Sequence, residues 1–579
     1  MNRKNLTAAV LAGLAGVAGI AGTAQAVNIN PDGTGQVLLY PYYTTNDGNQ
    51  TLISVVNTTD QAKAVKVRFL EGFNSREVLD FNLYMSREDV WTAVVADSSA
   101  FGAEAGVPHL FTADTTCTVP YLYEMGSTAP GLQAFLSFAY TGNAEDGGPT
   151  EIGRAGEGHL EMIEMGTLLG DAAADATHGT DGMPADCLAI NERWYEVVGG
   201  TDGTWFDEAT NGCGSADADG QACTDTGRNS GGLFGGAAIV NADNGTMYSY
   251  DAKAIQGFDD TDDGLHYLPG TIFPSLQSGS GKDAWVFFGV PQNQAVEVNY
   301  DNSVDALSAV FMHDYIMNEY VVEEDLNAGT EWVITFPTKN FYADADRMVA
   351  AGLIPKAPKE PADAVPPGYT CTEIKTGDDA GKFEDCEANA RAPFTQLFGA
   401  NDDGDPLCEI VGLKTWDREE DTFQRPDVPS VVIPPTVSPA PPRDCIPGVD
   451  DECTSETVFQ LCNEVNVLRF GEQVVFGTPD FDGESLLLEV TDEFAAGWGR
   501  INFTYTGEFD TNDDPVMRTL PANNLQGVSL VGLPVTGFSA YEFENDFAEG
   551  GDVKAYYGGL FGHKASVRGL GPIATPVSQ

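Results

Sequence analysis

Basic residues are scarce in this sequence. The 579 residues include 29 Lys and Arg against 87 Asp and Glu, which gives a net charge of −58. Proteins bind nucleic acid by neutralising phosphates with basic patches, so we expect no nucleic-acid partner. An anionic membrane surface is disfavoured for the same reason. The charge indicates either a surface kept soluble by carboxylates or one that gathers divalent cations.

Catalytic signatures are also missing. None of the six histidines lies in an HExxH or HxxEH motif, and the sequence has no GxSxG, Walker A or GxGxxG pattern. The spacing of His159, Glu161 and Glu164 suits no standard metal site. We therefore expect a structural or interaction protein. The alternative is a secreted hydrolase that uses carboxylates on an extracellular polymer, since paired carboxylates cleave glycosides.

Long apolar runs are confined to the first 26 residues. Arg3 and Lys4 precede the apolar run from Leu6 to Gly22, and Ala24-Gln25-Ala26 supplies the small residues that signal peptidase accepts. We predict that residues 1–26 are a signal peptide and that the mature chain begins near Val27 without a membrane-spanning segment. The protein is then exported to the cell surface or the medium, with the periplasm as an alternative.

No CxxC motif occurs, which argues against a zinc site. An even number of cysteines behind a signal peptide predicts disulfides instead. The ten candidates fall into two even groups, within which we expect pairing: Cys117, Cys187, Cys213 and Cys223, then Cys371, Cys386, Cys408, Cys445, Cys453 and Cys462. Cys213–Cys223 and Cys445–Cys453 are the local bridges that the short loops favour.

Period-two hydrophobicity dominates the rest of the chain. Val65, Val67 and Phe69 alternate with polar residues, and further short runs recur between turn residues. We predict a mainly β protein with two β-sandwich-like, immunoglobulin-like domains. The predicted segments are a first domain at 27–353, a Gly/Asp-rich insertion within it at about 142–235, a Pro/Cys-rich connecting region at 354–464 and a second domain at 465–579.

Several local elements follow from the same patterns. The sequence predicts two helices, Cys187–Val198 with Asp186 as N-cap and Asp344–Ala351 ending at Gly352. It predicts a hairpin from Ala237–Asn241 and Thr246–Tyr250. Fifteen of the 32 prolines lie between Pro355 and Pro447, yet Leu407–Trp416 within that region reads as a strand. Trp91 is predicted to lie in the core.

Acidic loops are the best candidates for a bound ion. The segment from Thr478 to Glu489 nearly follows the calcium-loop pattern, with Asp480, Asp482 and Glu489 at ligand positions. Thr478 replaces the first Asp of that pattern. A second cluster runs from Asp259 to Asp263. We predict that calcium stabilises the protein through these loops, the alternative being ordinary solvated turns.

Three segments resemble uncharacterised exported proteins of proteobacteria. They are residues 35–93, which begin GQVLLYPYYTTNDGNQ, residues 329–342 (GTEWVITFPTKNFY) and residues 532–538 (GLPVTGF). Together they cover under a fifth of the chain. The resemblance implies export and a cell-surface location, with a cell-surface or extracellular polymer as partner. It implies no activity and no site residues.

Overall fold

A computed structural model describes most of the chain. The described residues are 26–103, 105–122, 131–194, 205, 225–262, 264–289, 294–376, 379–399, 407–419, 457–479, 486–488, 494–512, 514–523, 528–545 and 555–571. Within them the protein is mainly β, as the sequence predicts. The immunoglobulin-like part of that expectation stays a prediction.

The N-terminal half forms a first sandwich of two sheets. The larger sheet has the order β1-β14-β2-β10-β4-β5-β8, and β11 also pairs with β10. Its strands are β1 (Asn28–Ile29), β2 (Val37–Thr44), β4 (Lys63–Glu71), β5 (Glu77–Met85), β8 (Cys117–Val119), β10 (Glu157–Leu168), β11 (Thr226–Gly227) and β14 (Lys253–Gln256). The smaller sheet, β13-β12-β3-β6-β7-β9, comprises β3 (Asn49–Asn57), β6 (Val90–Asp97), β7 (Pro108–Thr112), β9 (Gly131–Ala134), β12 (Leu233–Asn241) and β13 (Thr246–Asp251).

The core of the first sandwich follows the predicted alternation. Val65, Val67 and Phe69 of β4 face the same hydrophobic cluster as Trp91 and Val95 of β6, and all five are fully buried. The prediction that Trp91 is a core residue is confirmed. The β12–β13 hairpin also forms with the predicted pairing, from Asn241 opposite Thr246 outward.

Strand β10 lies at the centre of the larger sheet, between β2 and β4, although it falls within the segment predicted as an insertion. Leu160 and Met162 face the sandwich core, whereas Glu161 faces the other side, and both Glu161 and Glu164 are buried. Gly158 is required here, because a Cβ at this position would lie 2.0 Å from the Leu70 carbonyl oxygen of β4.

The C-terminal half forms a second sandwich. One sheet has the order β23-β22-β26-β18-β34, with β18 (Tyr315–Val321), β22 (Glu409–Asp417), β23 (Thr457–Leu461), β26 (Ala496–Asn502) and β34 (Lys564–Ser566). The other has the order β25-β24-β19-β32-β33, with β19 (Ala328–Thr335), β24 (Val465–Phe470), β25 (Leu487–Leu488), β32 (Thr536–Phe543) and β33 (Tyr557–Gly562). Strand β22 confirms the predicted strand at 407–416. The pairings of β18 and β19 cross residue 353, where the sequence analysis ended the first domain.

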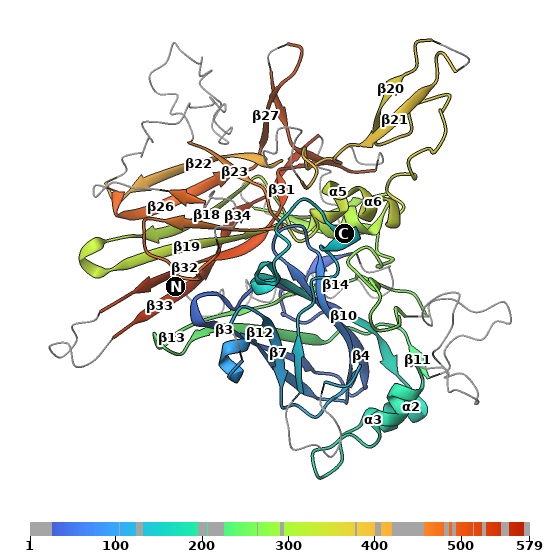
Figure 1. The fold of residues 1–579 in the computed structure, drawn as a ribbon, viewed down its shortest axis with the longest axis vertical. Coiled ribbons are helices and arrows are strands. Elements are labelled where there is room, and N and C mark those ends of the chain that lie inside the picture. The colour runs from blue at the N-terminus through green and yellow to red at the C-terminus, as the bar shows by residue number, and fades with distance from the viewer. Residues whose placement is uncertain are drawn as a thin grey trace, which may run out of the picture.

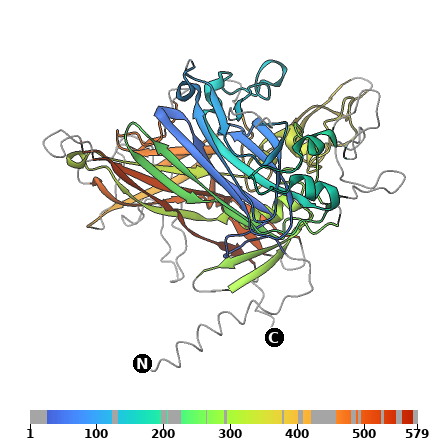
Figure 2. The same cartoon turned by 90° about the horizontal axis from the view of Figure 1, so that it is seen from below.

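The two sandwiches lie side by side (Figures 1 and 2). Trp332 and Ile334 of β19 share one face and pack inside the second sandwich, while Val333 points to the other side. There it joins Tyr42 and Tyr248 of the first sandwich in a separate hydrophobic cluster. Strand β19 therefore contributes to both the second core and the contact between sandwiches.

Helices are short and lie between strands. They are α2 (Gly170–Ala176), α3 (Cys187–Glu192), α4 (Ser303–Ala309), α5 (Asn340–Ala343) and α6 (Ala345–Ala350). The Asp186 and Asp344 side chains cap α3 and α6 at the predicted starts, by accepting from the backbone N–H groups of Ala189 and Arg347. Helix α3 ends at Glu192, six residues earlier than predicted.

Smaller sheets complete the fold. They are β15–β16 (Asp283–Phe288, Gln294–Asn299), β17–β31 (Met312–His313, Leu533–Pro534), β20–β21 (Tyr369–Glu373, Phe383–Ala388), β27–β28 (Tyr505–Phe509, Pro515–Met517) and β29-β30-β35 (Thr519–Pro521, Ser529–Val531, Arg568–Leu570).

Three disulfides lie within the described residues: Cys117–Cys187, Cys371–Cys386 and Cys408–Cys462. Each pairs cysteines of one predicted group. They tie α3 to β8, close the β20–β21 hairpin, and connect residues next to β22 and β23. The two predicted local bridges, Cys213–Cys223 and Cys445–Cys453, lie outside the described residues.

Candidate functional site

The first predicted calcium loop is mostly outside the described residues, which include none of Asp480, Asp482 and Glu489. Thr478, at the start of that loop, is described. Its hydroxyl donates to Glu157 Oε2 at 3.0 Å, so it is engaged with the first sandwich.

Asp259 of the second predicted loop is described and is 1% exposed, whereas Asp263 lies outside the described residues. The Asp259 carboxylate accepts from Asn229 Nδ2 at 3.2 Å and from the Thr261 hydroxyl at 2.9 Å. Its backbone N–H and carbonyl bond the Gln36 side chain at 3.1 and 2.7 Å. Asp259 thus anchors its loop to Gln36, the residue before β2. The described part of the chain holds no group of three or more His, Cys, Asp or Glu arranged to hold a metal ion. Calcium binding stays a prediction.

Buried charges line the outer face of the larger sheet of the first sandwich. The segment that contains Tyr267 and Gly270 covers part of this face: Asn82 Nδ2 donates to the Tyr267 carbonyl at 2.9 Å, and the Gly270 N–H donates to Asp80 at 2.8 Å. The polar side chains that alternate with the core residues are therefore shielded from water and pair with one another. The pairs on this face are Lys66–Asp80, Arg68–Glu77 and Arg68–Glu161, while Lys63 and Glu164 pair on the core-facing side of the sheet.

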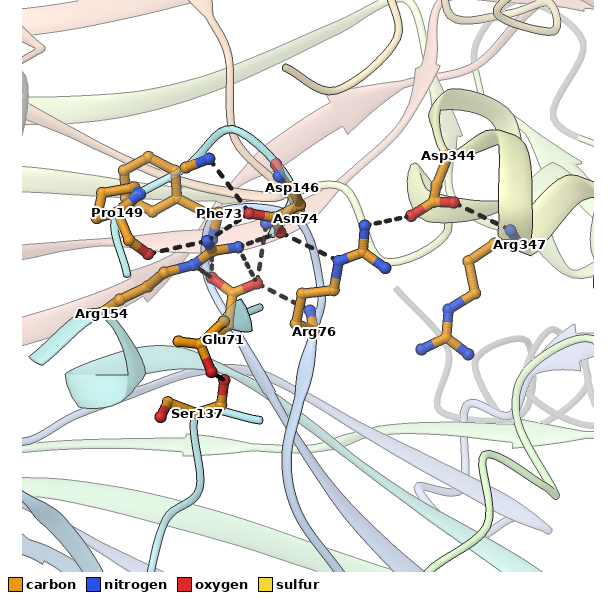
Figure 3. Close-up of polar contacts among 12 residues, drawn as sticks. Glu71, Phe73, Asn74, Arg76, Ser137, Asp146, Pro149, Arg154, Asp344 and Arg347 are labelled. Carbon is orange, nitrogen blue, oxygen red and sulfur yellow. Dashed lines mark hydrogen bonds and ion pairs between the residues drawn. The ribbon is translucent and has the colours of Figure 1, made fainter. Parts of the chain in front are cut away.

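Arg154 is the most completely bonded of these charges (Figure 3). Its guanidinium lies between two carboxylates, with Nε and Nη2 on Glu71 at 2.8 and 3.0 Å, and Nη1 and Nη2 on Asp146 at 2.8 and 2.7 Å. Nη1 also donates to the Pro149 carbonyl at 3.1 Å. These five bonds match the five donors of a guanidinium, which offsets its desolvation.

Two further contacts extend the Arg154 cluster. The guanidinium lies 4.5 Å from the Tyr140 ring centroid, a cation–π distance. Arg76 donates to Asp146 at 3.1 Å and reaches Asp344, the cap of α6, at 3.0 Å (Figure 3). Burial opposes ionisation of Asp146, but its bonds to Arg154 prevail and lower its pKa to about 2. The cluster therefore holds the β4–β5 turn, the loop before β10 and the start of α6 together.

Two buried polar side chains near this cluster lack hydrogen bonds. His159 of β10 is fully buried and neither ring nitrogen makes a hydrogen bond, although Nε2 lies 4.0 Å from Glu161 Oε1. Burial and the nearby Arg68 charge lower its pKa to about 3, so it is neutral. Glu464 is also fully buried with both oxygens unbonded, and burial raises its pKa well above the ordinary range. Ser75 lies near Glu464, but its hydroxyl completes no hydrogen bond of normal geometry.

Another pair of carboxylates lies between the sandwiches. Glu157 of β10 accepts from the Tyr42 hydroxyl at 2.9 Å, and Glu331 of β19 accepts from the Phe476 N–H at 2.8 Å. Burial raises both pKa values to about 7, with a smaller contribution from the charge of Glu71 at Glu157 and from the charge of Glu157 at Glu331. Each of these two carboxylates therefore bonds a neighbouring segment at the contact between the sandwiches.

The outward face of the β22-β26-β18-β34 sheet carries aromatic and basic side chains. Trp416 of β22 and Trp498 of β26 are cross-strand partners whose rings stack, with centroids 4.0 Å apart and planes 8° apart. Lys414 Nζ lies 5.0 Å from the Trp416 ring centroid, and the Arg500 guanidinium lies 5.5 Å from it. We call this set the aromatic–cation strip; its members are Lys414, Trp416, Trp498, Arg500, Tyr315 and Lys564.

Strand register explains how the strip forms. Lys414 pairs with Arg500, Arg500 with Met317, and Met317 with Lys564, so these side chains share one face across four strands. The inward face of the same strands carries the apolar core of the second sandwich, including Leu413. The strip is absent from the elements that the sequence predicted. Its signal is a Trp two positions from a basic residue in two separate strands, as in Lys414-Thr-Trp416 and Trp498-Gly-Arg500.

Comparison with known proteins adds no assignment: the chain matches no protein-family model, no curated protein and no solved structure. Among the described residues, none of the helices is long and apolar enough to cross a membrane.

Proposed function

We propose that the protein is exported and acts at the cell surface or in the medium as a structural or interaction protein. The observation that carries the proposal is the aromatic–cation strip, in which stacked indoles and basic side chains lie on the outer face of a sheet in a strongly acidic protein. Aromatic and Arg side chains are the groups most enriched in binding surfaces.

The rest of the fold supports this role. Three disulfides in the described residues suit an oxidising compartment. The buried ion pairs and the contact between sandwiches give a rigid frame for a surface built from strands, and sites on such elements are held more accurately than sites on loops.

Cell fractionation with N-terminal sequencing tests the location. We expect the protein outside the cytoplasm with Val27 as its first residue. The matched control is Ala26→Arg, which removes the small residue that signal peptidase requires and should leave a longer, membrane-retained precursor. Wild-type protein confined to the cytoplasm with residues 1–26 still attached would refute the proposal.

A further inference from the structure

The outer face of the smaller sheet of the first sandwich, which includes β3, β7, β12 and β13 (Figure 1), is apolar. Side chains alternate along a strand, so the neighbours of core residues such as Ile53 and Trp91 point outward. One outward row crosses β12, β3, β6, β7 and β9 and consists of Ala238, Leu52, Val94, Phe111 and Leu132. A second row consists of Phe234, Val56 and Val90. We call these two rows, together with Met247 of β13, the apolar face.

Large side chains of the apolar face are open to solvent. Five of them are between 40% and 60% exposed: Leu52, Val90, Leu132, Phe234 and Met247. At one margin the Phe101 ring stacks on Phe111, with centroids 5.6 Å apart, which widens the apolar area. Soluble monomers rarely leave contiguous apolar patches of more than a few hundred Å² in water. The apolar face therefore indicates a contact with another molecule.

Charge is nearly absent from this side of the sheet. The outward positions of its six strands, all of which the structure describes, include no Lys or Arg and one carboxylate, that of Asp251. Charged residues nevertheless make up 20% of the chain, with 87 acidic against 29 basic. Copies with a net charge of −58 repel each other where their acidic surfaces meet. Two apolar faces can meet without opposing carboxylates.

The position of Asp251 fits such a contact. It is the last residue of β13, which is the edge strand of the sheet, so it lies at a corner of the face. Most homodimers have two-fold symmetry. A two-fold axis that runs along or across the strands places this corner over a different part of the second copy, so the two Asp251 carboxylates stay apart.

The size of the apolar face also suits a pair of copies. Strands lie about 4.8 Å apart and residues along a strand about 3.4 Å apart. The sheet has six strands, of which β13 has six residues and β3 has nine. The face therefore measures roughly 24 Å by 20 to 30 Å, and two such faces would bury roughly 1,000 to 1,400 Å² in total. This area reaches the lower limit of stable protein interfaces.

Other partners fit the apolar face less well. Proteins that lie on a membrane flank their apolar residues with Lys and Arg, which the outward positions of these strands lack. A peptide that adds a strand pairs with the edge of a sheet rather than with its face. A second copy meets both the apolar character and the size of the surface.

We propose that the mature protein forms a symmetric dimer in which the apolar faces of two copies pack against each other. Leu52 lies in the third of the six strands and in the longer row, so it is near the middle of the contact. Phe234, in the second row, lies nearer its margin. The contact uses the same surface on both copies, which closes the assembly at two chains.

Sedimentation velocity of the mature protein measures the dimer. Between about 1 and 100 μM, wild-type protein should shift from the mass of one chain toward that of two. Raising the salt concentration from about 0.05 to 0.5 M should tighten the dimer several-fold, because salt screens repulsion between acidic copies. Leu52→Glu should weaken it about a hundredfold or more, since it buries an unpaired carboxylate in the contact. Phe234→Glu should weaken it about tenfold.

Leu188→Glu is the matched control. Leu188 is 53% exposed and lies on α3, which the Cys117–Cys187 disulfide ties to the other sheet of the first sandwich. This variant adds the same charge away from the apolar face and should leave the dimer intact. Circular dichroism and melting temperatures confirm that each variant is folded.

Three results would overturn the proposal. Wild-type protein that stays monomeric at about 100 μM makes no such contact. A dimer that Leu52→Glu does not weaken uses another surface. Monomeric wild-type protein that binds phosphatidylcholine vesicles, with binding lost in Leu52→Glu, assigns the apolar face to lipid. None of these results bears on the exported location, which fractionation and N-terminal sequencing test separately.

Discussion

Arg154 and Glu71 are 83 residues apart in sequence and meet in a buried two-bond pair, with Nε 2.8 Å from Oε2 and Nη2 3.0 Å from Oε1. The same guanidinium holds Asp146, so one side chain links three segments of the fold. Removing one partner of such a pair leaves an uncompensated buried charge.

Arg154→Met is therefore expected to lower the free energy of unfolding by about 3–5 kcal/mol. The matched control is Arg418→Met, because Arg418 is 63% exposed and lies 3.6 Å from Glu323. That surface pair should contribute less than about 1 kcal/mol. Urea denaturation of both variants measures the difference, and equal losses would show that the Arg154 cluster does not stabilise the fold.

Glu331 makes stability depend on pH. Burial raises its pKa from 4.5 to about 7, so the folded chain holds a proton that the unfolded chain has released. Stability should therefore fall as the pH rises from about 4.5 to about 7, and the loss should be complete above that window.

Glu331→Gln removes the ionisable group and keeps its shape. We expect it to raise the free energy of unfolding at pH 8 by about 3 kcal/mol and to change it little at pH 4.5. Glu297→Gln, at an exposed position of β16, should have no such pH-dependent effect. Denaturation at the two pH values decides the matter, and a gain at pH 4.5 as large as at pH 8 would contradict the assignment.

Disulfide formation should be complete in the mature protein. Thiol titration of the unfolded, unreduced chain should find almost no free cysteine among the ten. Replacing Cys408 and Cys462 by Ser opens a bridge with a sequence separation of 54 and should cost about 4 kcal/mol of unfolding free energy. Two or more reactive thiols per wild-type chain would be inconsistent with the cysteine analysis.

Calcium should raise the melting temperature at matched ionic strength. An ion at a hundredfold excess over its Kd adds about 2.7 kcal/mol to the folded state. Asp480→Asn should remove this calcium-dependent increment. Asp259→Asn should destabilise the protein with or without calcium, because the Asp259 carboxylate bonds Asn229 and Thr261. Identical melting temperatures of the wild-type protein in calcium and in chelator would show that the acidic loops bind no stabilising calcium and serve only to keep the protein soluble.

Local pattern predicts a good part of this fold. Alternation identified β4, turn residues identified the β12–β13 hairpin, and Asp caps located the starts of α3 and α6. These features depend on residues close together in sequence. The mainly β class follows from them.

Contacts between residues far apart in sequence cannot be predicted from the same local patterns. Alternation in β4 cannot show whether Lys66 and Arg68 face water or a later segment of chain, and here they are buried. The sequence did not predict strand β10, because it carries the charged residues Glu161 and Glu164. The fold buries both of them, in ion pairs with Arg68 and Lys63. The aromatic–cation strip is equally hidden, since its members lie on four strands spread over 250 residues of sequence.

Retention of the protein on its own cells tests the surface role most directly. Purified mature protein is added to cells that lack its gene, and the bound fraction is measured after washing. We predict that wild-type protein and Trp285→Ala, a change at a β15 tryptophan that is also 37% exposed, bind alike, whereas Trp498→Ala is largely washed away. Equal retention of all three proteins would contradict the account, because the aromatic–cation strip would then play no part in binding.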